Sequence, residues 1–432
     1  MVTTTTTRRR NKGGKPVFAG AQGCVFVPSL KCKHRPRTND DTISKLGYKS
    51  GSNSEMREQE KIMPYIKKIR NYEKYFSVHA TSCEPDALSP HDLEGFNETC
   101  INFDKDIDAS NVNRNLDELR AINMPHLGTD LKGWMGKSPL DARRVRQLND
   151  HISNLLMHAI VPMNQLGVIH NDLKSENIMM DKTESNVRII DWGLAGITTP
   201  HHVIPEHHFM NNPVTFNRPF STMIISHDIE SLYPTFISHL PAKFESRQLE
   251  PFVNGLYHKM EPIGHDYLTY IFESMFNVDA ETATLMLNAV IEKYNAKILY
   301  HFTNAARRQF MLHEYFNKVY RFNTDVWGTM SVFYSMFMLP RDHFIMPDST
   351  YVAVLQQYRA LFRTIVFVNG HKRMNVQRIV QQLRQINNTV TPRNKFRAVN
   401  TSVKKMVRFN IVPIKARHTQ RVPTPHPLRG LH

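Results

Sequence analysis

The stretch GVIHNDLKSENIMMDKTESNVRIIDWGLAG, residues 167–196, limits the folds open to this chain more than any other part of it. Its short apolar segments VIH, NIMM and VRII alternate with polar connections, a pattern that predicts short strands joined by a loop and a hairpin. The polar side chains fall in the connections: Asp172 lies in the loop, Asn177 begins the next strand, and Asp191 follows the strand after that. A hairpin between these strands would return Asp191 to the side of Asn177.

These residue types indicate phosphoryl transfer. That reaction needs oxygen ligands for a metal ion, a lysine near the phosphates and a group that orients the attacking hydroxyl. Asn177 and Asp191 offer hard oxygen ligands, which suit Mg²⁺ rather than zinc. Asp172 can accept a hydroxyl proton, and Lys174 can neutralise charge that builds on the transferred group. The stretch therefore predicts a metal-dependent phosphoryl-transfer site.

The N-terminal part of the chain has a strand pattern. Residues 17–27, VFAGAQGCVFV, predict a strand, a turn at Gly20 and Gly23, and a second strand. Residues 42–46, TISKL, predict a short strand that carries Lys45. The hairpin and this strand together favour a small sheet ahead of the transfer site.

A helix is predicted from Ser54 to Ile69 because apolar residues recur there at helical spacing. Glu58 shares a face with the isoleucines and is our choice for the acidic partner of Lys45. Glu55 and Glu60 remain open alternatives.

In this order the motifs resemble those of the protein kinase family. HNDLKSEN resembles the catalytic loop H-R-D-x-K-x-x-N, and DWG resembles the D-F-G triplet. GAQGCVF resembles the last two glycines and the valine of the Gly-rich loop, with Phe18 at the position of the first glycine. TISKL resembles the V-A-I-K strand. TDVWGTM resembles the helix that begins D-x-W-S-x-G.

The resemblance implies ATP as the phosphoryl donor, Mg²⁺ or Mn²⁺ as the metal and a protein as the substrate. It also implies a set of site residues: Asp172 and Lys174 as catalytic residues; Gly20, Gly23, Val25, Lys45 and Glu58 for the nucleotide; Asn177 and Asp191 for the metal; His170, Gly193 and Asp325 as structural support. Asp228, in SHDIESLY, is a rival to Asp325 for the carboxylate that braces the catalytic loop.

Details of the motifs narrow the resemblance to serine/threonine protein kinases of large DNA viruses. GCVF followed by PSLKCK, then ISKL, FNRPFS in place of A-P-E, and YFNKVYRFNTDVWG are similar to that group. Lys174, two residues after Asp172, favours serine or threonine over tyrosine as the acceptor. Asn171 replaces the arginine that pairs with an activation-loop phosphate in many kinases. We therefore expect constitutive activity or control by a partner.

The resemblance implies an α+β, two-lobed protein-kinase fold, with a mostly-β N-lobe and a mostly-α C-lobe. It spans about residues 17–340, and 83–112 form an excursion. The expected parts are a basic disordered tail at 1–15, an N-lobe at 16–127, a C-lobe at 128–387 with a helical insertion at about 222–320, and a flexible basic tail at 388–432.

Charge is uneven along the chain. From Ser349 to His432 there is no Asp or Glu, so this segment supplies the whole net charge of +16. Such a field attracts nucleic acid or an acidic partner. It serves equally as a solubilising tail.

Cys24, Cys32, Cys83 and Cys100 match no paired zinc template, and four cysteines in 432 residues do not suggest a disulfide framework. We expect buried free thiols in a reducing compartment, and thus an intracellular protein in the host cytoplasm or the virion. The first residues carry no apolar signal segment, and no apolar run is long enough to span a membrane.

Two other functions fit the motifs. A tryptophan at the position of Trp192 also occurs in the D-W-E motif of small-molecule kinases of the aminoglycoside or choline type, which makes such a kinase an alternative. A catalytically dead kinase fold that binds nucleic acid through its basic tail is a third hypothesis, although none of the catalytic positions is degraded.

Overall fold

The computed structural model describes residues 14–20, 23–34, 41–78, 80–103, 106–198, 204–205, 214–260 and 265–391. A boundary after Thr391 separates this body from Pro392–His432. The predicted tails at 1–15 and 388–432 lie almost wholly outside the described residues, as do Ala21 and Gln22 between the two glycines of the predicted turn.

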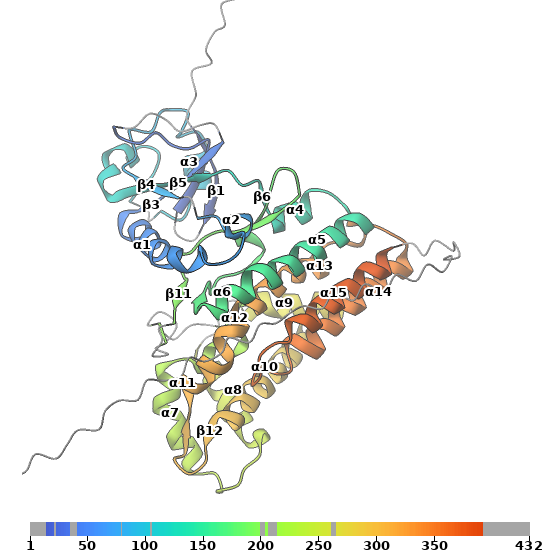
Figure 1. Ribbon diagram of the computed structural model, residues 1–432. Helices are drawn as coiled ribbons and strands as arrows, with labels where there is room; N and C mark the ends of the chain where they lie inside the picture. Colours follow the sequence, from blue (N-terminus) through green and yellow to red (C-terminus); the bar gives the residue numbers. More distant parts are fainter. Residues whose placement is uncertain are drawn as a thin grey trace, which may run out of the picture. The chain divides into compact units, whose positions relative to one another are not determined.

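A five-stranded antiparallel sheet, in the order β1-β2-β3-β5-β4, forms the N-terminal region (Figure 1). Its strands are β1 (Lys15–Gly20), β2 (Gly23–Val27), β3 (Thr42–Tyr48), β4 (Thr81–Cys83) and β5 (Leu119–Pro125). The register of β1 on β2 shifts between Pro16 and Phe18. The predicted hairpin and the strand that carries Lys45 are confirmed.

Helix α1 (Lys49–Ile66) follows β3 directly, and the short α2 (Tyr72–Tyr75) comes after it. The helix begins at Lys49 rather than at the predicted Ser54, and it ends at Ile66 rather than at Ile69. Its early start covers residues of low helix propensity, so packing of the buried face overrides local preference. That face consists of Ser52, Glu55, Gln59, Ile62 and Ile66.

Residues 84–118, here called the cap, cover one face of the N-terminal sheet. They contain α3 (Phe96–Thr99) and 3-10 turns at Val112–Arg114 and Leu116–Glu118. Cap and sheet share a buried apolar cluster: Cys24, Phe26, Leu30, Leu46, Leu88, Phe96, Cys100, Phe103, Ile107, Val112, Leu116, Leu119 and Ala121. The excursion predicted at 83–112 is therefore a packed layer.

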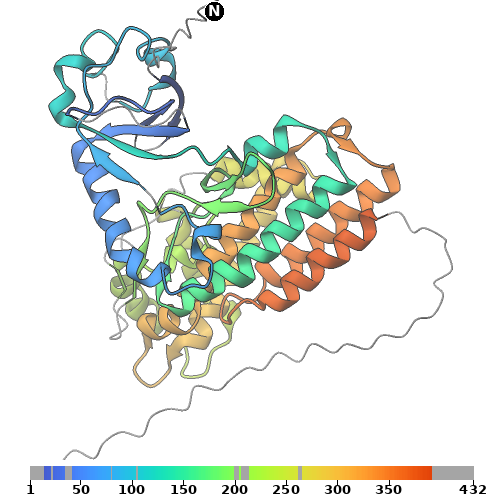
Figure 2. The ribbon, with the colours of Figure 1, turned by 45° about the horizontal axis from the view of Figure 1, so that its top comes forward.

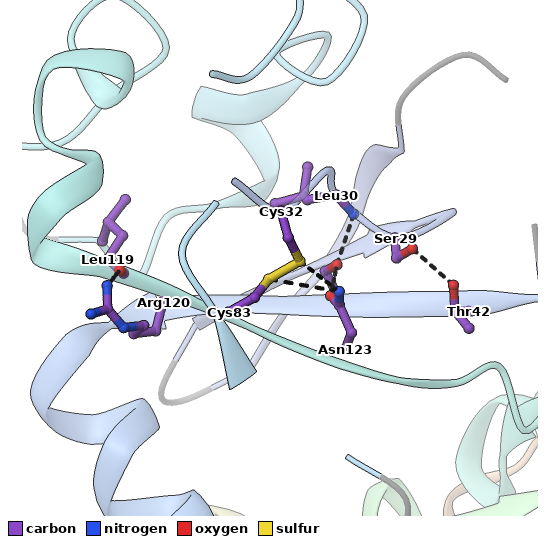
Figure 3. Close-up of a disulfide and its surroundings, with 9 residues drawn as sticks. Ser29, Leu30, Cys32, Thr42, Cys83, Leu119, Arg120 and Asn123 are labelled. Carbon is purple, nitrogen blue, oxygen red and sulfur yellow. Dashed lines mark hydrogen bonds between the residues drawn. A yellow bond between two sulfur atoms is a disulfide. The ribbon is translucent and has the colours of Figure 1, made fainter. Parts of the chain in front are cut away.

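The four cysteines form two disulfides, Cys24–Cys100 and Cys32–Cys83, so the prediction of free thiols is wrong. Figure 3 shows the second pair, where Asn123 of β5 donates its side-chain amide to Sγ of Cys32 at 3.2 Å. The partners are distant in sequence: Cys24 meets Cys100 because the cap folds back on the sheet, and Cys32 meets Cys83 because β4 joins the same sheet. Spacing along the chain carried no signal of that approach.

The remainder of the described chain is rich in helices. They are α4 (Leu131–Lys137), α5 (Ala142–Leu155), α6 (Val161–Gln165), α7 (His227–Ser238), α8 (Glu250–Lys259), α9 (His265–Phe276), α10 (Ala280–Phe302), α11 (Leu312–Tyr315), α12 (Arg321–Ser331), α13 (Ser335–Met338), α14 (Asp348–Leu361) and α15 (Val376–Val390). Helix α5 packs along α15, as Figures 1 and 2 show from two sides. A strand-rich part followed by a helix-rich part agrees with the predicted α+β class.

Short strands frame the motif at 167–196. A three-stranded sheet in the order β10-β9-β6 joins β6 (Thr129–Asp130), β9 (Ile178–Met180) and β10 (Val187–Ile189). Separate pairs join β8 (Val168–Ile169) with β11 (Gly196–Ile197), β7 (Leu140–Asp141) with β14 (Phe344–Ile345), and β12 (Thr303–Asn304) with β13 (Gln309–Phe310). The antiparallel pairing of β9 with β10 confirms the predicted hairpin.

Helices α5 and α6 are joined by a π-helical turn at Leu156–Ile160. Residues 222–320 hold α7 to α11 and the β12–β13 hairpin, and their standing as an insertion stays a prediction. Among the described residues, none of the helices is both long and apolar enough to cross a bilayer.

Candidate active site

Asp325, at the centre of α12, fixes the backbone of the loop that contains Asp172. Its carboxylate accepts the backbone N–H groups of His170 at 3.0 Å and Asn171 at 2.9 Å, and the side-chain amide of Asn164 at 2.7 Å. Asn171 has a φ of 64°, a conformation that asparagine tolerates better than most residues. Burial raises the pKa of Asp325, while the charge of His170 and these hydrogen bonds oppose that rise. Asp325 thus contacts the loop, whereas the rival Asp228 pairs with Lys259 at 2.9 Å.

Asp172 is held by donors on three sides. Oδ2 accepts the Nδ2 amide of Asn177 at 2.9 Å and lies 3.1 Å from Nζ of Lys174. Oδ1 accepts the Nδ2 amide of Asn217 at 2.8 Å. The side chain of Asp172 is 18% exposed, so solvent and an incoming hydroxyl can still reach the carboxylate.

Asn217 is a site residue that sequence reasoning missed. It lies near the end of the segment from Asp191 to Pro219, here called the activation segment, of which 199–203 and 206–213 lie outside the described residues. Trp327 of α12 donates its indole N–H to the carbonyl of the preceding residue, Phe216, at 3.1 Å. The FNRPFS motif was noted in the sequence, but nothing in it indicated which side chain turns toward Asp172.

Asp191 follows β10 and returns beside the catalytic loop. The N–H of Ile190 donates to the carbonyl of Asn177 at 3.0 Å, and the imidazole Nε2 of His170 lies 2.9 Å from the carbonyl oxygen of Ile190. Asp191 itself has a φ of 65°, and the N–H of Gly193 donates to its Oδ1 at 3.4 Å. The hairpin therefore brings the second aspartate to the loop, as the sequence predicted.

Lys45 links the N-terminal sheet to this loop. Its Nζ lies 2.8 Å from Oε2 of Glu55 and 3.8 Å from Oδ1 of Asp191. Burial lowers the pKa of Lys45, but the charges of Asp191, Glu55 and Asp172 outweigh that effect, and the pKa is raised. The lysine therefore stays positively charged.

The acidic partner of Lys45 is Glu55, so the choice of Glu58 is wrong. Glu58 faces outward and pairs with Lys61 at 2.6 Å. The buried face of α1 includes the polar residues Glu55 and Gln59. A search for apolar residues at helical spacing could not reveal that they are buried. Burial raises the pKa of Glu55, and the charge of Lys45 opposes that rise.

Trp192 connects the activation segment to the residues that follow α2. Its indole N–H donates to the carbonyl of Ser77 at 3.1 Å, and its ring lies 5.7 Å from that of Phe76 and 5.0 Å from that of His170, centroid to centroid. The ring is 3% exposed. Trp192 thus fills a core position that its larger size and polar N–H suit.

Gly20 and Gly23 face each other at the end of the β1–β2 hairpin, and Val25 pairs with Lys45 on the next strand. A Cβ on Gly23 would lie 2.3 Å from the carbonyl oxygen of Leu46, so only glycine lets β2 approach β3 this closely. The glycines and valine predicted for the nucleotide therefore lie on the sheet that carries Lys45.

The donor set fits Mg²⁺ held jointly with phosphate oxygens. Asn177 donates its amide nitrogen to Asp172, which leaves its amide oxygen available as a ligand for a metal ion. The side chain of Asp191 is 36% exposed and open to a ligand. Within the described residues there is no cluster of three His, Cys, Asp or Glu side chains that would hold a metal alone. One carboxylate, one amide and substrate phosphates form the kind of site that Mg²⁺ commonly takes.

Comparisons with known proteins match this part of the chain. Residues 129–215 match the family model for the protein kinase domain. A segment of 45 residues is 42% identical to casein kinase II subunit alpha' of Saccharomyces cerevisiae. That match covers 10% of this chain and 13% of the yeast protein. Residues 129–215 are thus similar to the protein kinase domain, and the yeast match supports the same superfamily.

Proposed function

We propose that the chain is an ATP- and Mg²⁺-dependent serine/threonine protein kinase. The observation that carries the proposal is the carboxylate of Asp172, which is oriented by Lys174, Asn177 and Asn217 and remains partly exposed. A solvated loop aspartate has no need of three converging donors. A carboxylate that must align one substrate hydroxyl does need them.

Each residue of the site has its own role in the proposed reaction. Asp172 orients the acceptor hydroxyl and takes its proton, while Lys174 neutralises charge on the transferred group. Lys45, positioned by Glu55, binds the α- and β-phosphates, and Asn177 and Asp191 would hold the metal. When bound, ATP supplies the phosphoryl group and Mg²⁺ offsets the negative charge of the phosphates.

Activation without a phosphate on the activation segment is part of the proposal. Asn171 offers no guanidinium for such a phosphate, and its side chain is buried, at 4% exposure. Asn217 supplies another connection, because it ties the activation segment to Asp172 through an uncharged amide. This contact supports constitutive activity or control by a partner.

The first test replaces the carboxylate. Asp172→Asn keeps the size of the side chain but removes the base, so transfer of labelled phosphate to protein should fall by about 100-fold to 10,000-fold. ATP affinity should stay within twofold or so, since Lys45 is untouched. Asp228→Asn, which alters an ion pair with Lys259 at 2.9 Å, is the matched control and should transfer normally. Full activity of Asp172→Asn would refute the proposal.

The acceptor needs its own experiment. Wild-type protein should be offered peptides that differ only in serine, threonine or tyrosine at one position, and a panel of small alcohols. Transfer to serine and threonine peptides is expected. Transfer to small alcohols alone would favour the small-molecule kinase suggested by Trp192.

Several earlier predictions stay predictions. Viral origin rests on motif resemblance, and the intracellular location rests on composition. The nucleic-acid partner rests on the charge of residues that lie mostly outside the described chain. If the basic tail binds polyanions, deletion of 392–432 should abolish a strongly salt-dependent interaction.

A further inference from the structure

The cap reaches the nucleotide-binding hairpin at several points. Cys100 is bonded to Cys24, which directly follows Gly23 in β2. The side-chain amide of Asn102 donates to the carbonyl of Gly20, so the cap also contacts the end of β1. These contacts come from one short stretch of the cap.

Apolar packing and charge add to the same contact. The ring of Phe96 lies 6.3 Å from that of Phe26 in β2, centroid to centroid, and stacks on Phe103 at 5.8 Å. Glu94 pairs with Lys15 at the start of β1. Cap residues 94–103 thus follow the hairpin from its first residue to its glycines.

The hairpin needs this support because of its place in the sheet. Among the described strands β1 is the outermost of the five, and its partner is β2. Val25 of β2 lies opposite Lys45 of β3, whereas Cys24 lies opposite Leu46, whose side chain is in the cluster shared with the cap. Because side chains alternate along a strand, the cap holds the hairpin from the face opposite Lys45.

We propose that Cys24–Cys100 is a redox-controlled modification site that sets the ATP affinity of the hairpin. The inference rests on the proposed kinase function and adds a regulated covalent bond to it. With the bond intact, β2 is tied to the cap and the glycines are held in position. With the bond reduced, packing and hydrogen bonds alone hold the hairpin, which is then ordered for a smaller fraction of the time.

The chemistry is thiol–disulfide exchange. One thiolate of a small dithiol attacks a sulfur of the pair, the Cys24–Cys100 bond breaks, and a mixed disulfide forms. The second thiol of the reagent then displaces the remaining protein thiol, so the protein gains two electrons and two protons while the dithiol becomes a cyclic disulfide. Re-formation by a disulfide oxidant such as oxidised glutathione runs in the opposite sense and releases two glutathione thiols.

Access is local. Cys24 and Cys100 are 1% and 4% exposed, but Ile101, next to Cys100, is 72% exposed. Cys100 ends the single turn of α3, so opening of a few residues would expose the sulfur. Global unfolding is therefore not required for reduction.

The second disulfide provides a matched control. Cys32–Cys83 joins the segment after β2 to β4 at the other edge of the sheet, and it contacts Asn123 (Figure 3). It makes no bond to residues 15–27 of the hairpin among the contacts described. Its loss should lower stability without changing how the hairpin meets ATP.

The experiment compares full-length wild type, Cys24→Ser/Cys100→Ser and Cys32→Ser/Cys83→Ser, each before and after a small dithiol, with thiol state read by mass spectrometry. The readouts are the Kd of a fluorescent ATP analogue and amide hydrogen exchange of residues 15–27 without nucleotide. Reduction should raise the Kd by about threefold or more in wild type and in the Cys32/Cys83 variant, because a hairpin ordered a third of the time binds that much more weakly. The Cys24/Cys100 variant should start at the higher Kd and not respond.

Two results would overturn the inference. An equal Kd in oxidised and reduced wild type would refute it while leaving the kinase proposal intact. Absence of ATP binding in both redox states would overturn the proposed function and this inference with it. If the Cys24/Cys100 variant does not fold, wild type and the Cys32/Cys83 variant still decide the question, provided their circular dichroism is unchanged by the dithiol.

Discussion

Asn217 holds Asp172 through one hydrogen bond of 2.8 Å, and its removal tests how far catalysis depends on orientation. Asn217→Ala should leave the KM for ATP unchanged and lower kcat by about tenfold to a hundredfold, because a small misplacement of a reacting group is costly. Steady-state kinetics at saturating ATP would measure this. Because Asn217 is only 4% exposed, its replacement can also lower stability, so a thermal melt of the variant should accompany the kinetics. An unchanged kcat would show that Lys174 and Asn177 suffice.

Glu55 should make ATP affinity dependent on pH. Its pKa is raised above the 4.5 of an ordinary glutamate, chiefly by burial. As pH falls through that raised value Glu55 takes up a proton, its ion pair with Lys45 is lost, and ATP affinity should decline. The Kd of an ATP analogue should be measured from neutral to acidic pH. It should begin to rise at a higher pH than it would if the partner of Lys45 were an exposed glutamate with an ordinary pKa.

Two variants check this assignment. Glu55→Gln should bind ATP more weakly at neutral pH, because the ion pair with Lys45 is absent, and its Kd should lack this pH response. Glu58→Gln should behave as wild type, since Glu58 pairs with Lys61. If the Kd of Glu55→Gln still rises at acidic pH as in wild type, the pH dependence comes from another group.

Individual residues differed in how far the sequence could place them. Asp172, Asn177 and Asp191 lie in connections between short strands, where local chain geometry brings them together. Glu55 is brought to Lys45 by the packing of a whole helix, and Asn217 is brought to Asp172 by contact with α12. Local geometry let the sequence place the first three residues and motif resemblance placed Asp325, whereas the contacts of Glu55 and Asn217 depend on packing between distant elements that no motif indicated.

At the scale of elements, α12 approaches the catalytic loop through Gly328. A Cβ there would lie 2.5 Å from the carbonyl oxygen of Leu173 and 3.0 Å from that of Asn217. Gly328→Ala should therefore push both segments away from the helix. We expect a loss of about 1–3 kcal/mol in the free energy of unfolding, measured by urea denaturation, and a lower kcat.

Gly255 in α8 is the matched control for that change. A Cβ at Gly255 meets nothing within 4 Å, so Gly255→Ala should be neutral or should stabilise the protein by up to about 1 kcal/mol through helix propensity. Equal effects of the two substitutions would contradict the close approach at Gly328.

Elements with strong periodicity were predicted well, and the cap was not. Apolar residues recur at helical spacing in α1, and the sequence predicted this helix with shifted ends. The cap is a series of short turns whose order comes from the shared cluster with β2, β3 and β5. Local sequence had no signal for a layer whose stability depends on a sheet formed elsewhere.

For the molecule as a whole, His371 should contribute to acid sensitivity. Burial first, then the nearby charges of His301, Lys372 and Lys297, lower its pKa to about 4 from an ordinary 6.5. Its ring stacks on that of His301 at 4.0 Å, centroid to centroid. Between these two pKa values the unfolded chain binds more protons than the folded chain. The contribution of His371 to the free energy of unfolding is therefore present above pH 6.5 and is lost progressively toward pH 4.

The measurement is the unfolding midpoint in urea across that pH range. Wild type should lose stability as pH falls, and His371→Gln, which cannot be protonated there, should show a shallower decline. Identical slopes would assign the acid sensitivity to other groups.

The outermost strand of the N-terminal sheet has one more consequence. An unpaired strand edge invites pairing with another chain, and Val17 and Phe18 in β1 are more than half exposed. Yet β1 begins with a lysine, then a proline that lacks an N–H, and its register is irregular just beyond them. Charge, a missing donor and a distorted ladder all discourage docking of a foreign strand, so this border should resist self-association even at high protein concentration.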